Sequence, residues 1–214
     1  MVVLDAAHGG DDSGGQLGAS VAEKSVTLAL SVRLRSLLAA RGFQVVTTRE
    51  GNVNLDADAR AQIANHAQAA GCLSFHATES GSGVHLFTSS LAPTQPTRFL
   101  AWKTAQSAYV ARSLRLAGAL NSAFEKSGDA ATAPAITATL ARATLPGLDS
   151  FACPAVAIEI APLRNADGSI ATDATDAGYQ AQVVTALAAA LLEWKTDWET
   201  ERDMGPARGG HTQP

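Results

Sequence analysis

The sequence has no cluster of basic residues and no long hydrophobic run. Its 214 residues carry a formal net charge of −4, with 16 Lys and Arg against 20 Asp and Glu. Nucleic-acid-binding proteins concentrate basic residues on one face, so we expect no nucleic-acid partner. A membrane span needs about 20 consecutive apolar residues, and the alanine-rich stretch around 186–192 is shorter than that. We therefore expect no membrane span.

Cysteine is scarce, and a signal peptide is not visible. Cys72 and Cys153 lie in apolar segments typical of buried strands, where two free thiols are the expectation. A disulfide needs Cα atoms within about 7 Å of each other, and the sequence does not give that distance. Residues 2–5, Val-Val-Leu-Asp, are typical of a core strand rather than of the basic start of a signal peptide. This suggests a chain cut from a longer precursor.

Strand and helix patterns alternate along most of the sequence. Apolar residues make up 46% and charged residues 17%, as in globular proteins. Strands are predicted at 2–4, 43–48, 72–77, 84–88 and 155–160, with a short one near 136–140, and helices at 23–40, 56–70, 103–126 and 178–198. This order predicts a single α/β domain, a twisted, mostly parallel sheet of about five to six strands with helices on both faces. We place that domain at 1–200 and expect 201–214 to be a disordered tail.

Two helices carry apolar residues at helical spacing. The helix at 56–70 is expected to turn Ile63, Ala67 and Ala70 inward and to stop at Gly71. The last helix includes Trp194 and Trp198 on its apolar face, where core packing is the expected role and a sugar-stacking platform is the alternative.

Three polar residues are predicted at the carboxyl ends of strands. His8 follows the first strand, His76 ends the strand at 72–77, and Glu159 lies near the end of the strand at 155–160. Glu23 opens the first long helix and can face the same edge of the sheet. Ligands of open α/β sheets bind beyond the carboxyl ends of the strands, so we expect these four side chains to converge.

Two imidazoles and two carboxylates in one place indicate a hydrolytic zinc site. Catalytic zinc takes three protein ligands and keeps one position for water, and two His with one Glu is a recurring set. With His8, Glu23 and His76 as ligands of Zn²⁺, Glu159 remains a free carboxylate. Zinc lowers the pKa of its water toward about 7, and a nearby carboxylate can accept the proton as general base. Each residue alone is weak evidence, and the prediction rests on their joint placement.

Several separated segments carry a resemblance to a known family. Residues 3–10, Val-Leu-Asp-Ala-Ala-His-Gly-Gly, run from a strand into a His-Gly-Gly turn, and Glu23-Lys24 begins a helix. Residues 73–77, Leu-Ser-Phe-His-Ala, and 154–159, Pro-Ala-Val-Ala-Ile-Glu, are strands that end in a polar residue. Smaller landmarks are Thr48-Arg49, Arg60, Ala64-Asn65, Gly83-Val84 and Asn165. In this order they resemble the zinc-dependent N-acetylmuramoyl-L-alanine amidases of type 3 over residues 1–165, whereas 90–150 match poorly.

The resemblance implies an activity and a place of action. Members of this family hydrolyse the amide between N-acetylmuramic acid and the L-alanine of the stem peptide in peptidoglycan. By the same resemblance His8, Glu23 and His76 would bind zinc and Glu159 would be the general base, in agreement with the residues themselves. Peptidoglycan as partner implies the periplasm or the extracellular cell envelope, and we expect a monomer.

Four departures from the family pattern affect the surroundings of the site. Ala7 replaces a usual Gly, Thr78 a common Asn, Ala161-Pro162 a usual Gly-Phe, and His85 a frequent acidic residue. If position 7 needs a positive φ, Ala strains the turn before the first ligand. His85 is expected either at the rim near the metal or as a residue that orients a ligand. None of the departures removes a ligand.

Alternatives stay open for the function and for the loops. A non-catalytic peptidoglycan-binding or regulatory domain of the same fold would explain the departures, and a zinc peptidase or deacylase would act on another small amide. The poorly matching residues 90–130 would suit a lid or an autoinhibitory helix. Asp11 and Asp12 are expected to be solvated rather than to orient His8, and His66 is expected on a solvated helix face. The turn at 12–15 resembles that of trypsin-like serine proteases, but those are all-β.

Overall fold

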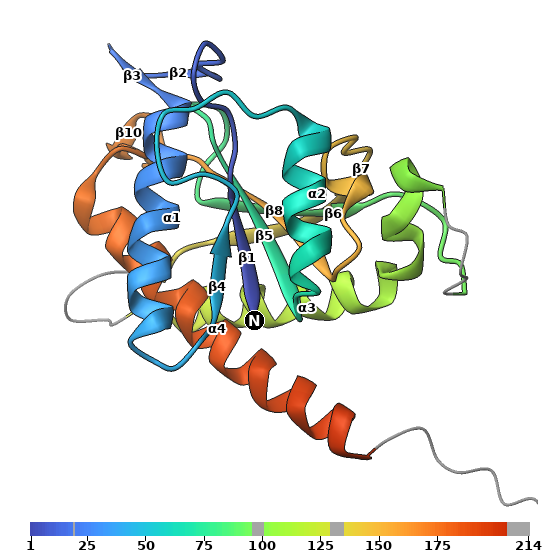
Figure 1. The fold of residues 1–214 in the computed structure, drawn as a ribbon. Helices are drawn as coiled ribbons and strands as arrows, with labels where there is room; N and C mark the ends of the chain where they lie inside the picture. Colours follow the sequence, from blue (N-terminus) through green and yellow to red (C-terminus); the bar gives the residue numbers. More distant parts are fainter. Residues whose placement is uncertain (19, 96–100, 129–134, 205–214) are drawn as a thin grey trace, which may run out of the picture.

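The computed structural model describes residues 1–18, 20–95, 101–128 and 135–204, and its centre is a six-stranded sheet (Figure 1). The strand order is β4-β1-β5-β8-β6-β7. These strands are β1 (Val2–Ala6), β4 (Val45–Thr47), β5 (Gly71–Ala77), β6 (Val84–Ser89), β7 (Ala138–Ala143) and β8 (Ala155–Ile160). Only the β6–β8 pair is antiparallel within this sheet. Two hairpins lie outside it, β2 (Gln16–Leu17) with β3 (Val21–Ala22) and β9 (Leu163–Arg164) with β10 (Ile170–Thr172).

Helices cover both faces of the sheet, so the predicted α/β fold is confirmed. One face carries α1 (Glu23–Ala39), α3 (Val110–Glu125) and α4 (Ala177–Met204). The other carries α2 (Ala57–Ala67) and the short 3₁₀ helix η2 (Leu148–Ser150), against which a second 3₁₀ helix, η1 (Trp102–Ala108), packs. The C-terminal part of α4 projects beyond the sheet (Figure 1). No helix in the described ranges is long and apolar enough to cross a bilayer.

The two faces of the sheet differ in the size of their side chains. Leu4, Leu73 and Val156 are in register and point toward α1, whose buried Leu30 belongs to the same cluster. Side chains one position earlier point the other way and are smaller: Val3, Cys72 and Ala155. Because side chains alternate along a strand, this difference continues along β1, β5 and β8. The face under α2 therefore allows a closer approach of helix to sheet.

This close packing explains why the inward face of α2 was predicted only in part. The buried residues of α2 are Arg60, Ala61 and Ala64, whereas Ile63 is only partly buried. Ala67 packs against the cluster under α2, as predicted. The helix ends at Ala67 rather than at residue 70, and Gly71 begins β5 instead of stopping the helix. Small residues and one arginine of α2 face the alanine-rich side of the sheet. A prediction of the buried face from large apolar residues is therefore rotated by a fraction of a turn.

The bounds of two predicted helices, 103–126 and 178–198, need correction. The helix expected at 103–126 is η1 followed by α3, with a break at Tyr109. Helix α3 packs against α4 and β6 in the core, so residues 110–125 form a layer of the domain rather than a lid. Helix α4 continues to Met204, into the segment expected as a tail, and 205–214 lie outside the described residues. The strand expected near 136–140 is β7.

The last helix confirms the core role expected for its tryptophan. Trp194 is only 6% exposed, and its indole N–H donates to the carbonyl of Ala70, 2.9 Å away. A buried tryptophan with a satisfied N–H is a packing residue. Trp198, one turn later, is partly exposed.

The two cysteines form a disulfide, so the expectation of free thiols was wrong. Cys72 on β5 and Cys153 just before β8 have Cα atoms 6.2 Å apart, and both are almost completely buried. They are 81 residues apart in sequence, and they meet because β5 and β8 are neighbouring strands. The bond lies in the small apolar cluster under α2, where little large hydrophobic surface is available.

Removing the disulfide should lower the stability of the fold. For Cys72→Ala combined with Cys153→Ala we expect the free energy of unfolding to fall by about 2 to 5 kcal/mol, because the bond closes a long loop in the unfolded chain. Urea unfolding of the variant and of the unmodified protein, each with and without reductant, measures this difference. Reductant should destabilise only the unmodified protein. Two titratable thiols in denatured, unreduced protein would contradict the assignment.

Candidate metal centre

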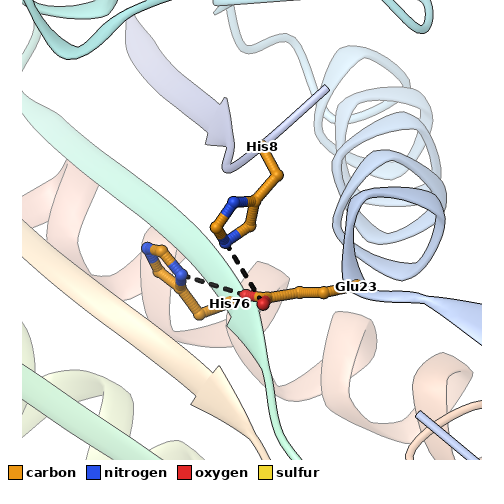
Figure 2. A group of neighbouring side chains, drawn as sticks. All are labelled: His8, Glu23 and His76. Atoms are coloured by element: carbon orange, nitrogen blue, oxygen red, sulfur yellow. Dashed lines mark hydrogen bonds and ion pairs between the residues drawn. The ribbon is translucent and has the colours of Figure 1, made fainter. Parts of the chain in front are cut away.

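Three of the four predicted side chains meet at the carboxyl edge of the sheet. His8 follows β1, Glu23 is the first residue of α1, and His76 lies on β5. Figure 2 shows the carboxylate of Glu23 between the two imidazoles. Glu23 Oε2 lies 3.2 Å from His8 Nε2, and Oε1 lies 3.1 Å from His76 Nδ1. One donor atom from each of the three residues lies within 4.8 Å of the others, which is close enough for one metal ion.

Glu23 is held as a buried, ionised carboxylate. It is 6% exposed and accepts hydrogen bonds from the backbone N–H groups of Gly15 (2.8 Å) and Ala77 (3.1 Å). Burial by itself raises its pKa, but the hydrogen bonds with His76 and His8 and with the two amides together hold the pKa of Glu23 well below its usual range. An ionised carboxylate at neutral pH is what metal binding requires.

His8 has a carboxylate partner that the sequence did not reveal. Its Nδ1 lies 2.8 Å from Oδ2 of Asp12, although Asp12 is largely exposed, so the expectation that Asp12 is merely solvated was wrong. The pKa of His8 is raised, first by its hydrogen bond to Glu23 and also by Asp12, against the opposing effect of burial. Because Asp12 holds Nδ1, Nε2 is the ring nitrogen directed at the cluster, and such partners orient metal-binding histidines.

The strained position at this turn is His8 rather than Ala7. His8 has a φ of 61°, whereas Ala7 does not adopt a positive φ. The concern that Ala7 strains the turn is therefore removed, because glycine is not needed at position 7. The positive φ falls on His8, a member of the cluster, and sparsely populated backbone conformations are often found at functional sites.

Two buried arginines hold the strained turn. Arg60 donates from Nη1 to the carbonyl of Ala6 (2.6 Å) and from Nη2 to that of His8 (2.7 Å). Arg49 donates from Nε to Ala6 (2.8 Å) and from Nη2 to Ala7 (3.0 Å). Both arginines are less than 9% exposed. The sequence singled them out only as family landmarks, and the structure shows that they fix three consecutive carbonyls around the first ligand.

Glu159 lies beside the cluster rather than in it. In the sheet, His76 on β5 is in register with Glu159 on β8, which is in register with His85 on β6. The three side chains therefore share one face. His85 Nδ1 lies 3.1 Å from Glu159 Oε2, so His85 contacts the expected general base instead of orienting a metal ligand. The glutamate side chain is 33% exposed, which leaves it open to solvent and substrate.

A cavity of about 380 Å³ opens next to the cluster on the α2 side of the sheet. His8 and His76 reach into it, and its lining includes the small side chains of Ser74 and Ala157 and the loop at 145–148. Pockets that take small organic groups have this size and combine apolar walls with a few polar groups. His66, in contrast, is exposed on α2, as expected from the sequence.

Comparison with known proteins identifies the family. The family model described as N-acetylmuramoyl-L-alanine amidase matches residues 2–193. The chain belongs to this family.

One sequence relative matches part of this chain, and two solved structures match nearly all of it. A germination-specific N-acetylmuramoyl-L-alanine amidase of Bacillus subtilis (strain 168) is 33% identical over 90 residues, covering 36% of this chain and 38% of that protein. The catalytic domain of the amidase CwlV from Bacillus (Paenibacillus) polymyxa var. colistinus is 23% identical, with a TM-score of 0.68 over 91% of this chain and 97% of that one. Ami1 from Mycobacterium smegmatis is 20% identical, with a TM-score of 0.70 over 92% and 96%. At these identities the solved structures establish only the fold of this chain.

A glycine beside the cluster provides a test of its geometry. A Cβ added at Gly14 would lie 2.6 Å from His8 Cδ2 and 2.7 Å from Glu23 Oε2, and Gly14 has a φ of +65°. Gly14→Ala should therefore displace two ligands without removing one and weaken zinc binding by about tenfold or more. Competition with a chelating dye measures the zinc affinity.

A second glycine is the matched control for this variant. Gly42 has a φ of +78° and no atom within 4 Å of an added Cβ, so Gly42→Ala introduces backbone strain without a clash. We expect its zinc affinity to be unchanged. Equal zinc affinities for the two variants would show that the cluster does not hold the ion.

Proposed function

We propose that this chain hydrolyses the amide bond between N-acetylmuramic acid and L-alanine in peptidoglycan, with residues 1–200 as the catalytic domain. The observation that carries the proposal is the meeting of His8, Glu23 and His76 at the carboxyl edge of the sheet, with Glu159 next to His76 in the register. The family match over residues 2–193 supports the choice of peptidoglycan as substrate.

The donor set suits zinc. Two imidazole nitrogens and one carboxylate are a recurring ligand set of catalytic zinc, in which a further position is left for water or substrate. Glu23 is ionised, and Nε2 of His8 is directed at the cluster because Nδ1 is held by Asp12. His8, Glu23 and His76 would hold the ion. Zinc bound there supplies a Lewis acid that acidifies water and polarises the scissile carbonyl.

Glu159 is the proton carrier in this proposal. Its carboxylate is partly exposed on the same sheet face as His76, and His76 lines the adjoining cavity. The carboxylate accepts a proton from the attacking water as the new C–O bond forms at the lactyl carbonyl. It then returns the proton to the nitrogen as the C–N bond breaks. The products are a lactyl carboxylate and a stem peptide with a free N-terminal L-alanine.

The disulfide supports action outside the cytoplasm. Buried disulfides form and persist in oxidising compartments such as the bacterial periplasm and the cell exterior. Cys72 and Cys153 are bonded next to the strand that carries His76. We propose the periplasm or the extracellular cell envelope as the place of action, where peptidoglycan is found.

The substitution Glu159→Gln tests the general-base assignment. It preserves size and hydrogen bonding but removes the group that accepts the proton, so the rate of peptidoglycan hydrolysis should fall about 100-fold or more. Mass analysis of released stem peptides with a free N-terminal alanine measures the rate and identifies the bond. Zinc content should remain at about one ion per chain. Digestion at the unmodified rate would show that Glu159 is not the base.

The substitution His76→Ala tests the metal centre, with His66→Ala as its control. Both remove one imidazole, but His66 is exposed on α2 and outside the cluster. Elemental analysis should find zinc lost in the first variant and retained in the second. Protein that takes up no zinc, yet sediments with purified cell wall without releasing stem peptide, would instead be a non-catalytic binding domain. Cleavage of a different amide would indicate a zinc peptidase or deacylase.

A further inference from the structure

The carboxylate of Glu159 has an asymmetric environment. Oε2 lies 3.1 Å from His85 Nδ1, whereas among the described residues no hydrogen bond reaches Oε1. An ionised carboxylate can only accept, so His85 must be the donor, with its proton on Nδ1. One oxygen of the carboxylate is therefore held and the other is free.

The surroundings of His85 fix the direction of its ring. A Cβ added at Gly81 would lie 2.4 Å from Cε1 and 2.9 Å from Nε2, so the backbone of Gly81 already lies against the edge of the ring away from Glu159. Phe87, on the same face of β6, makes an edge contact with the ring. Arg164 holds the loop by donating from Nε to the carbonyl of Gly81 (2.9 Å) and from Nη2 to that of Glu79 (2.7 Å). The ring is thereby kept with Nδ1 directed at Glu159.

We infer that His85 is a positioning residue for the general base: its Nδ1–H holds Oε2 of Glu159 so that Oε1 is the oxygen that takes the proton. This inference rests on the proposed function of Glu159. It also gives a role to a position where the resemblance leads one to expect an acidic residue. Glutamate has three rotatable side-chain bonds, and a partly exposed one without a fixed partner samples several rotamers.

The cost of losing this contact is a loss of alignment rather than of substrate binding. A displacement of about 1 Å at a catalytic group can reduce the rate by about 100-fold. For His85→Leu, which removes the donor but keeps an apolar side chain against Gly81, we expect kcat to fall about 10- to 100-fold. We expect KM and zinc content to stay unchanged, because His85 contacts none of the three metal-binding side chains in the described structure.

Two amide variants separate the donor from the shape of the ring. Asparagine carries its N–H₂ at the position of Nδ1, whereas glutamine carries it one bond further out, at the position of Nε2. His85→Asn should therefore recover most of the rate that His85→Leu loses, and His85→Gln should not. Equal rates for the two amides would contradict a role for Nδ1. His66→Leu, on the exposed face of α2, is the control and should keep the full rate.

A double-mutant cycle shows whether His85 acts through Glu159. The experiment combines His85→Leu with Glu159→Gln in zinc-loaded protein and measures single-turnover release of stem peptide from peptidoglycan. Residues that act as a unit are strongly non-additive, so the double variant should be no slower than Glu159→Gln alone. A further 10- to 100-fold loss in the double variant would mean that His85 acts independently, which overturns the inference.

The failure of this inference is distinguishable from failure of the proposed function. If Glu159→Gln by itself keeps the unmodified rate, the general-base assignment fails, and the inference about His85 fails with it. If Glu159→Gln is slow but His85→Leu has the full rate, only the positioning role is wrong. Circular dichroism and zinc content of each variant confirm that it is folded and loaded, so a low rate reports on alignment.

Discussion

A buried ion pair at the end of β1 is the interaction on which the site depends. Asp5 is 4% exposed and accepts hydrogen bonds from Arg60, from Thr48 Oγ1 and from Ser74 Oγ. Taking two charges out of water costs about as much as their attraction returns, so the pair is a weak source of stability. The hydrogen bonds of Asp5 instead fix positions: they connect β1 to β5, to α2 and to the segment that follows β4. From there Arg60 donates to the carbonyl of His8, which holds the strained backbone of His8 in place.

The same edge of the sheet gives two glutamates different environments. Glu23 is buried among four hydrogen-bond donors, which hold its pKa low and its geometry fixed. Within the described residues Glu159 has one hydrogen-bond donor, His85, and it is a third exposed. Such contrasting surroundings suit contrasting roles, a permanent anion at Glu23 and the proposed exchange of protons at Glu159. The alternation of strand side chains puts His76, Glu159 and His85 on one face, so this division follows from register as well as from residue type.

The sequence allowed the fold and the members of the cluster to be predicted because both depend on local signals. Apolar spacing marked α1, and polar residues at strand ends marked His8 and His76. What it could not give depends on strand order. The disulfide forms only because β5 lies beside β8. His85 meets Glu159 only because β6 and β8 pair in antiparallel orientation. The alternation of strand and helix patterns in the sequence specifies neither pairing. The hydrogen bond between Asp12 and His8 was not predicted because the turn between them contains two glycines with positive φ, Gly9 and Gly10.

Two of the departures from the family pattern, Ala7 and His85, do not indicate loss of the site. Ala7 occupies an ordinary backbone conformation, since the positive φ lies one residue later, and His85 has a carboxylate partner on the neighbouring strand. A domain that only binds cell wall gains nothing from a carboxylate buried between two imidazoles, and burial of an unneeded charge costs several kcal/mol. Glu23 nevertheless remains, with both backbone amides directed at it and Asp12 behind His8. A buried anion kept at this cost, with every partner in place, is better explained by an ion that it binds than by the stability of the fold.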